Sequence, residues 1–184
     1  LSTSRDYYVS STGLDTSNGL SIATAFKTIT KAISVVFSSL NLRGQQVTIN
    51  LMPGEYLESV VINGNSSGSY GLEPSLRIRR APGQAGVVYW SLDPLVNTVL
   101  VSIGRNARVS LDSIHFRGLS TNTPNVQFIG VTDSLLVLGA CDFNLLSTAV
   151  VSNTCHIRLK GSELQLTKAY TLLGGATNHI IAGK

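Results

Sequence analysis

The sequence predicts an all-β fold, a right-handed parallel β-helix (a solenoid) that opens with a short capping α-helix. Two observations predict it. Apolar residues recur at three- and four-residue steps only within the first forty residues, and from Gln45 onward they alternate with polar residues. Beyond residue 100, short segments resemble one another at a spacing of between 20 and 30 residues, which is typical of the coils of a solenoid.

Composition limits the class of protein. The 184 residues are enough for one domain with a buried core. Only 13% are charged, against about 25% in an average soluble protein. The net charge is +4, but the basic residues cluster densely only at Arg77, Arg79 and Arg80, so we expect no nucleic-acid partner. Two cysteines, Cys141 and Cys155, form no disulfide framework, and both are expected to be small buried hydrophobic residues.

The sequence shows no pattern of a membrane-spanning helix, and we expect no secretory leader. No segment approaches the ~20 apolar residues of a membrane helix, and residues 1–6 lack a charged-then-apolar pattern. Small polar residues and 17 glycines give the surface an extracellular character. A protein with such a surface and no leader fits release by lysis, so we expect it in a virion or outside the cell, without membrane insertion.

Residues 1–44 are expected to form a strand, a turn and the capping helix. Residues 7–10 predict the strand, residues 13–19 a polar turn, and residues 26–40 an amphipathic helix. Ser21 or Thr24 is the expected N-cap, and Gly44 lies just past the helix end. Residues 45–184 are expected to form the coils. The whole is one structural domain, a part of a longer chain or of a trimer.

Four segments begin matching copies of one pattern. VSLDSIHF (109–116), LVLGACDF (136–143) and IRLKGSEL (157–164) superpose without a gap, and residues 180–184 start a fourth copy. The superposition predicts two interior columns: Val109, Leu136, Ile157 and Ile180 in one, and Phe116, Phe143 and Leu164 in the other. A leucine-rich horseshoe is excluded because its repeat signature is absent. The helix should cover the first coil, since an open stack end exposes unpaired strand groups.

The opening of the chain resembles a known family. Residues 7–10 (YYVS), 25–33 (AFKTITKAI), 47–49 (VTI) and 53–56 (PGEY) resemble the first coil of pectate-lyase-like β-helix proteins. The spacer before Gly44 and the later GACDF (139–143) resemble the branch found in tailed-phage tail fibres and tailspikes. The resemblance covers most of the chain and is strongest over 7–62. It implies a homotrimeric virion appendage directed at the host cell surface, contacting other virion proteins and host glycan.

One column of outward-facing residues carries possible acid–base chemistry. The superposition places His115, Asp142 and Glu163 on neighbouring strands about 4.8 Å apart. Two carboxylates near 5 Å, roughly the separation found in retaining glycosidases, together with an imidazole would suit cleavage of a polysaccharide. The alternative is that these side chains only decorate a solvated or intersubunit face. Acidic residues are scarce, and few residues beside Asp142 and Glu163 could form the walls of a substrate groove, so we expect no cleavage.

A second outward column reads Arg108, Leu135, His156 and His179. Two stacked histidines could hold a metal, but no third ligand lies in register, so we expect no metal and no other cofactor. The apolar residues at outward positions predict a face buried between the subunits of a trimer. That face consists of Leu135, Val137 and Ile181.

Tyr89 and Trp90 are adjacent in one predicted strand, so one of them must point outward. An exposed aromatic ring is a candidate glycan contact, although a single tryptophan in a strand more often belongs to the core. Two functional hypotheses remain. The favoured one is a structural or adhesive module of a phage appendage that takes part in host attachment. The alternative is a polysaccharide-degrading β-helix enzyme, either a lyase or a glycoside hydrolase.

Overall fold

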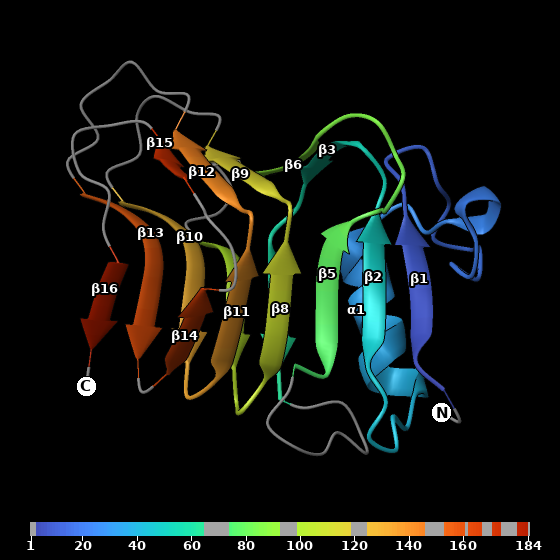
Figure 1. The fold of residues 1–184 in the computed structure, drawn as a ribbon, viewed down its shortest axis with the longest axis horizontal. Coiled ribbons are helices and arrows are strands. Elements are labelled where there is room, and N and C mark those ends of the chain that lie inside the picture. The colour runs from blue at the N-terminus through green and yellow to red at the C-terminus, as the bar shows by residue number, and fades with distance from the viewer. Residues whose placement is uncertain are drawn as a thin grey trace.

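A computed structural model describes residues 3–64, 74–92, 99–118, 125–145, 153–160, 162–166, 171–173 and 180–183. The fold is a right-handed parallel β-helix, as the sequence predicts, with three parallel sheets around one apolar core. Figure 1 shows the coils side by side, with the two ends of the chain at opposite ends of the stack.

Each coil contributes one strand to each sheet in the order A, B, C. Sheet A contains β1 (Arg5–Val9), β2 (Val47–Leu51), β5 (Leu76–Arg80), β8 (Arg108–Asp112), β11 (Leu135–Gly139) and β14 (Glu163–Leu166). Sheet B contains β3 (Gly54–Leu57), β6 (Val88–Leu92), β9 (His115–Gly118), β12 (Asp142–Leu145) and β15 (Thr171–Leu173). Sheet C contains β4 (Val60–Asn63), β7 (Val99–Gly104), β10 (Asn125–Thr132), β13 (Asn153–Lys160) and β16 (Ile180–Gly183).

Alternation of side chains turns one face of each sheet toward the core. On sheet B the inward positions form an aromatic stack, in which the Trp90 and Phe116 rings lie 5.9 Å apart and the Phe116 and Phe143 rings 4.9 Å apart. The Phe128 ring of sheet C lies 5.9 Å from the Phe143 ring, measured between centroids, so the stack also packs against sheet C. These rings are fully buried, so a ladder of aromatic rings fills this side of the core.

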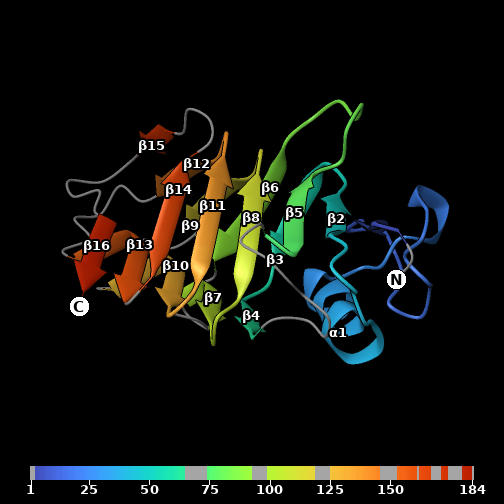
Figure 2. The same cartoon turned by 60° about the horizontal axis from the view of Figure 1, so that its bottom comes forward.

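The helix α1 (Ile29–Ser39) covers the first coil, as the sequence predicts. Figure 2 shows it beside β2, and it also contacts β1 and β4. Its apolar face is buried through Ile29, Ala32, Ile33 and Val36. Stacked coils need such a cover because the first coil otherwise exposes its apolar edge to water.

The predicted start of the helix was wrong by one turn. The N-cap is Thr28, whose side chain accepts a hydrogen bond from the Lys31 amide, and Ser21 instead caps the short 3₁₀ helix η1 (Ile22–Thr24). Phe26 pairs with Val9 as an isolated bridge, and Asp15 holds the backbone of Lys27 and Thr28. These contacts keep the chain extended up to Thr28.

The two predicted interior columns are correct for their first pairs and wrong for the third copy. Leu136 pairs with Val109 in sheet A, and Phe143 pairs with Phe116 in sheet B. Ile157 and Ile180 pair with each other, but in sheet C. Leu164 pairs with Leu136 rather than lying beneath Phe143.

The error has a physical reason, because two different corners of the coil share one sequence pattern. Two residues separate β8 of sheet A from β9 of sheet B, and two residues also separate β13 of sheet C from β14 of sheet A. Both corners read as strand, short turn, strand, with the same alternation. The register of sheet A shows the coil lengths, which are 29, 33, 27 and 28 residues in succession.

Candidate functional site

The outer face of sheet B carries a row of polar and aromatic side chains, one from each of four neighbouring strands. In register along the sheet, Glu55 pairs with Tyr89, Tyr89 with His115, and His115 with Asp142. Inward and outward residues alternate along each strand, and the buried aromatic stack occupies the inward positions. These four side chains therefore lie on the outer face. We call this row, together with Ser91 and Arg117 beside it, the sheet B face.

Arg117 is fixed by three partners on the sheet B face. Its guanidinium carbon lies 3.8 Å from the centroid of the Tyr89 ring, Nη2 lies 2.6 Å from the Glu55 carboxylate, and Nε donates to Ser91 at 3.1 Å. The Ser91 hydroxyl donates in turn to Glu55 at 2.7 Å. The side chain of Arg117 is 22% exposed, so its remaining surface is presented to solvent in one fixed orientation.

The network around Arg117 also changes the acidity of Glu55. The hydrogen bond from Ser91 is the largest effect and lowers the pKa of the Glu55 carboxyl, and the hydrogen bond and charge of Arg117 lower it further. Partial burial acts in the opposite direction without reversing the shift. Glu55 is therefore ionised and paired at neutral pH, and the ion pair crosses from β9 over β6 to β3.

His115 and Asp142 form the second half of the sheet B face. The Nδ1 atom of His115 lies 3.0 Å from the Asp142 carboxylate, and their side chains are 40% and 29% exposed. The Tyr89 ring meets the imidazole edge-on, with 5.8 Å between the ring centroids. The Asp142 carboxylate orients the ring, and in the neutral imidazole a carboxylate on Nδ1 favours the proton on that nitrogen and leaves Nε2 as the hydrogen-bond acceptor.

Of the two predicted aromatic contacts, only Tyr89 lies on the outer face. Trp90 is fully buried, stacks on Phe116, and donates its Nε1 proton to the Glu58 carbonyl at 2.8 Å. The prediction that Trp90 contacts glycan is therefore wrong. The inward position of Trp90 follows from the alternation, since Tyr89 and Trp90 are consecutive residues of β6.

The predicted carboxylate pair is not formed. Glu163 pairs with Leu135 in sheet A, whereas Asp142 pairs with Thr171 in sheet B. The reason is the misassigned corner described above, which placed β14 in the wrong sheet. The other acid on the sheet B face is Glu55, three strand spacings (about 14 Å) from Asp142. That separation exceeds the roughly 5–9.5 Å used by two-carboxylate glycosidases.

The predicted trimer face is also corrected. Leu135 and Val137 do occupy outward positions of β11, but only 3% and 6% of their surfaces are exposed in the single chain. Ile181 pairs with Arg158 in sheet C, so it does not share a face with Leu135 and Val137. The side chain of Ile181 lies outside the described residues.

The second predicted outward column, which placed two histidines in register with Arg108 and Leu135, is not formed. Arg108 pairs with Leu135, and Leu135 pairs with Glu163. His156 belongs to β13 in sheet C, and His179 lies outside the described residues, as does the side chain of His156. Among the residues that the structure describes, no three His, Cys, Asp or Glu side chains gather as metal ligands would.

Sequence reasoning missed Glu55, Ser91 and Arg117. Alternation alone places each of them outward, but Glu55 and Arg117 are 62 residues apart and meet only because their coils stack. The detectable repeat begins after residue 100, so the sequence offered no register for the coils that carry Glu55 and Ser91. A register extended backward from His115 through Tyr89 would have found both.

No family model and no curated protein matches the sequence. A search of solved structures matches a rhamnogalacturonan lyase with a TM-score of 0.51 and 11% identity. The match covers 97% of this chain and 60% of that structure, so the chain spans about three fifths of the lyase's length. At this identity the likeness shows the β-helix fold. Within the described part of the chain, no helix has the length and apolar character needed to cross a bilayer.

Proposed function

We propose that the chain is a polysaccharide-binding module of a phage appendage, a tail fibre or tailspike, and that it attaches through the sheet B face. The observation that carries the proposal is the fixed Arg117, stacked on Tyr89 and bonded to Glu55 and Ser91. Sugar recognition needs aromatic surface beside hydrogen-bonding groups that are already in place, because ordering side chains on binding costs free energy.

The arrangement of the sheet B face suits an extended ligand. Glu55, Tyr89, His115 and Asp142 follow one another across four strands, so the row runs along the axis of the β-helix. Four strands span about 14 Å, which fits several sugar units of one glycan chain. The backbone beneath is a regular sheet, so these groups stand on a rigid support.

Equilibrium binding to a panel of bacterial surface polysaccharides tests the proposal. Arg117→Ala and Tyr89→Ala should each weaken binding by about tenfold or more, since loss of a central aromatic or arginine contact costs over about 1 kcal/mol. Arg5→Ala and Tyr8→Ala remove the same side chains from β1 in sheet A and serve as matched controls. Equal binding by all four variants would contradict the proposal.

A second candidate function is cleavage of an acidic polysaccharide by elimination. The observation that favours it is the His115–Asp142 pair, which leaves the imidazole Nε2 as an acceptor on an accessible surface. The structure that matches the fold is named as a rhamnogalacturonan lyase. In such a step Nε2 would take the proton from C5 of a uronate, a C4–C5 double bond would form, and the C4–O bond would break, with the departing oxygen taking a proton from water.

The two candidates differ in one measurement. Incubation of the protein with acidic polysaccharides should leave the ultraviolet absorbance of unsaturated uronate at background if the module only binds. A rising absorbance that His115→Gln abolishes, with binding retained, would establish the lyase instead. Asp142→Asn should then slow the reaction without abolishing it, because Asp142 orients the imidazole and does not itself take the proton.

The proposal includes self-association. We propose that the module works as a homotrimer in contact with other virion proteins, as the family resemblance implies. Leu135 and Val137 are already covered within one chain, so a trimer would use other residues. Sedimentation velocity of the full-length protein should give a trimer, and a monomer at micromolar concentration would remove this part of the proposal.

A further inference from the structure

Sheet C has a hollow of about 350 Å³ on its outer face, on a different side of the β-helix from the sheet B face. Strands β4, β7 and β10 and the turns that follow β7 and β10 form its walls. Its lining consists of Asn63, Ser102, Ile103, Gly104, Arg105, Gly130, Thr132 and Asp133. The volume is within the range of about 300–1,000 Å³ typical of small-molecule sites.

The floor of the hollow is backbone, because two of its residues are glycines. Gly104 and Gly130 lie on neighbouring strands, and Gly130 pairs with Ser102. Gly104 does not have a positive φ, so its backbone conformation does not require glycine. A Cβ at Gly104 would lie only 3.0 Å from the Asn63 Oδ1. Glycine at 104 therefore leaves room for the Asn63 side chain, which covers this part of the floor, and Gly130 with Ser102 forms the half-buried part.

The polar side chains around the floor of the hollow have no partners among the described residues. In the part of the chain that the structure describes, Asn63, Ser102, Arg105, Thr132 and Asp133 have no side-chain hydrogen bond or ion pair. Arg105 and Asp133 are on adjacent turns, which the Asn106 amide joins to the Asp133 carbonyl at 2.9 Å, yet their charged groups do not pair. The hollow therefore offers an amide, two hydroxyls and one charge of each sign.

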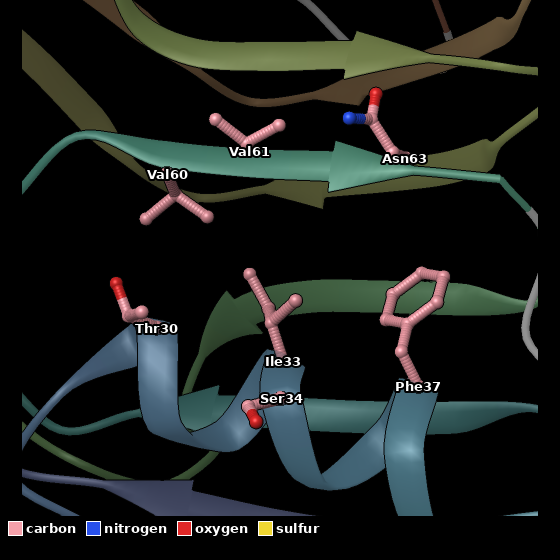
Figure 3. Close-up of a pocket in the computed structure, with 7 residues that line it drawn as sticks. All are labelled: Thr30, Ile33, Ser34, Phe37, Val60, Val61 and Asn63. Atoms are coloured by element: carbon pink, nitrogen blue, oxygen red, sulfur yellow. The ribbon is translucent and has the colours of Figure 1, made fainter.

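A second hollow of about 280 Å³ adjoins the first, and Asn63 lines both. It lies between α1 and β4, and Figure 3 shows Ile33 and Phe37 pointing from the helix toward the strand. Val61, on the other side of β4 from Val60 in this view, is 61% exposed. Apolar surface at one end and free hydrogen-bonding groups at the other match the two kinds of surface on a sugar ring.

We propose that the outer face of sheet C binds a neutral oligosaccharide, with one sugar ring over Ser102 and Gly130, beside Asn63, and the next toward Val61 and Phe37. Neutrality follows from the equal numbers of acidic and basic groups in the hollow. Asn63, Ser102 and Thr132 supply hydrogen bonds to the hydroxyls of the sugar, and Arg105 and Asp133 close the end of the site. Binding at this site does not depend on the sheet B face.

The test uses neutral hexasaccharides of glucose, mannose and galactose as probes, with amide shifts in NMR spectra as the readout. The expected result is binding of at least one probe, with shifts at Gly104 and Gly130. The variant Asn63→Ala/Thr132→Val and the filling variant Ser102→Phe should each weaken it by about tenfold or more. Ser110→Phe, at a similarly half-buried outward position of sheet A, should leave it unchanged within about twofold.

Two outcomes would overturn the proposal. One is the absence of binding by every neutral probe at about 10 mM, a concentration that detects even millimolar affinities. The other is unchanged affinity in both site variants, with thermal unfolding showing that they are folded. Arg117→Ala separates the two sites, because it should weaken polysaccharide binding at the sheet B face and leave the binding of neutral hexasaccharides intact.

Discussion

Arg117 connects three strands of sheet B through a single side chain. It extends from β9 over the Tyr89 ring of β6 and reaches Glu55 of β3. A guanidinium suits this position, because its plane stacks on an aromatic ring while its edge donates several hydrogen bonds. Lysine could supply the charge but neither the stacked plane nor the fixed fork of donors.

The paired state of Glu55 predicts a pH dependence of stability. Its pKa is lowered in the folded protein, so its contribution to the free energy of unfolding is present above the ordinary glutamate pKa of 4.5. That contribution is lost as the pH falls through the folded pKa. Denaturant unfolding should show Glu55→Gln to be less stable than wild type at pH 7, with the difference closing below pH ~4. A difference that grows on acidification would contradict the assignment.

Burial makes Cys141 an unreactive thiol. The side chain is fully buried, and burial raises the pKa of the thiol to about 12. At neutral pH almost no thiolate is present, so alkylation of the native protein should be slow and should accelerate on unfolding. The measurement is iodoacetamide labelling in a Cys155→Ser background, with the same protein in denaturant as the control. Rapid labelling of the native form would show that this part of the core is open.

At the scale of elements, the start of α1 depends on two acidic side chains from outside the helix. Glu58, just after β3, accepts hydrogen bonds from the backbone amides of Ile29 and Thr30 at 2.7 and 2.9 Å. Asp15 accepts from the amides of Lys27 and Thr28. The first amides of a helix have no partner within it, so Glu58 satisfies two of them and ties the helix to the first coil. Asp15 fixes the two residues just before the helix.

Removal of the Glu58 carboxylate should therefore loosen the cap of the β-helix. Glu58→Ala should lower the free energy of unfolding by about 1–2 kcal/mol, the usual cost of losing a helix cap. Hydrogen exchange at residues 29–33 should quicken more than exchange in sheet B. Glu55→Ala, which removes a carboxylate from the same strand region but does not contact α1, is the control. Equal exchange at α1 in both variants would show that Glu58 does not hold the helix.

Some elements could be predicted from the sequence, and others could not, for a physical reason. The spacing of Ile29, Ile33 and Val36 predicted a helix, because one face of a helix has its own period. Alternation predicted strands and their inward sides, but every strand of a β-helix has the same alternation. The sequence therefore could not say which sheet holds β13 and β14, and Glu163 was assigned to the wrong row.

At the scale of the whole molecule, one core supports three outer faces of different character. Sheet B presents the fixed row from Glu55 to Asp142. Sheet C presents the glycine-floored hollow. Sheet A carries an ion pair between Arg77 and Asp112 at 2.5 Å, and Leu135 and Val137 are buried beyond it. Stacked coils let surface residues change without disturbing the core, so each face can take its own ligand.

Mapping a bound polysaccharide onto the backbone amides of the protein tests the central claim, that the sheet B face is a glycan-binding surface. A surface polysaccharide that binds in the panel, cut to soluble oligosaccharides, would be titrated into isotope-labelled protein. The expected result is saturable shifts centred on Tyr89, His115 and Arg117, which need at least about tenfold more ligand in Arg117→Ala. Binding whose shifts fall on sheet A, or which persists unchanged in Arg117→Ala, would contradict the claim.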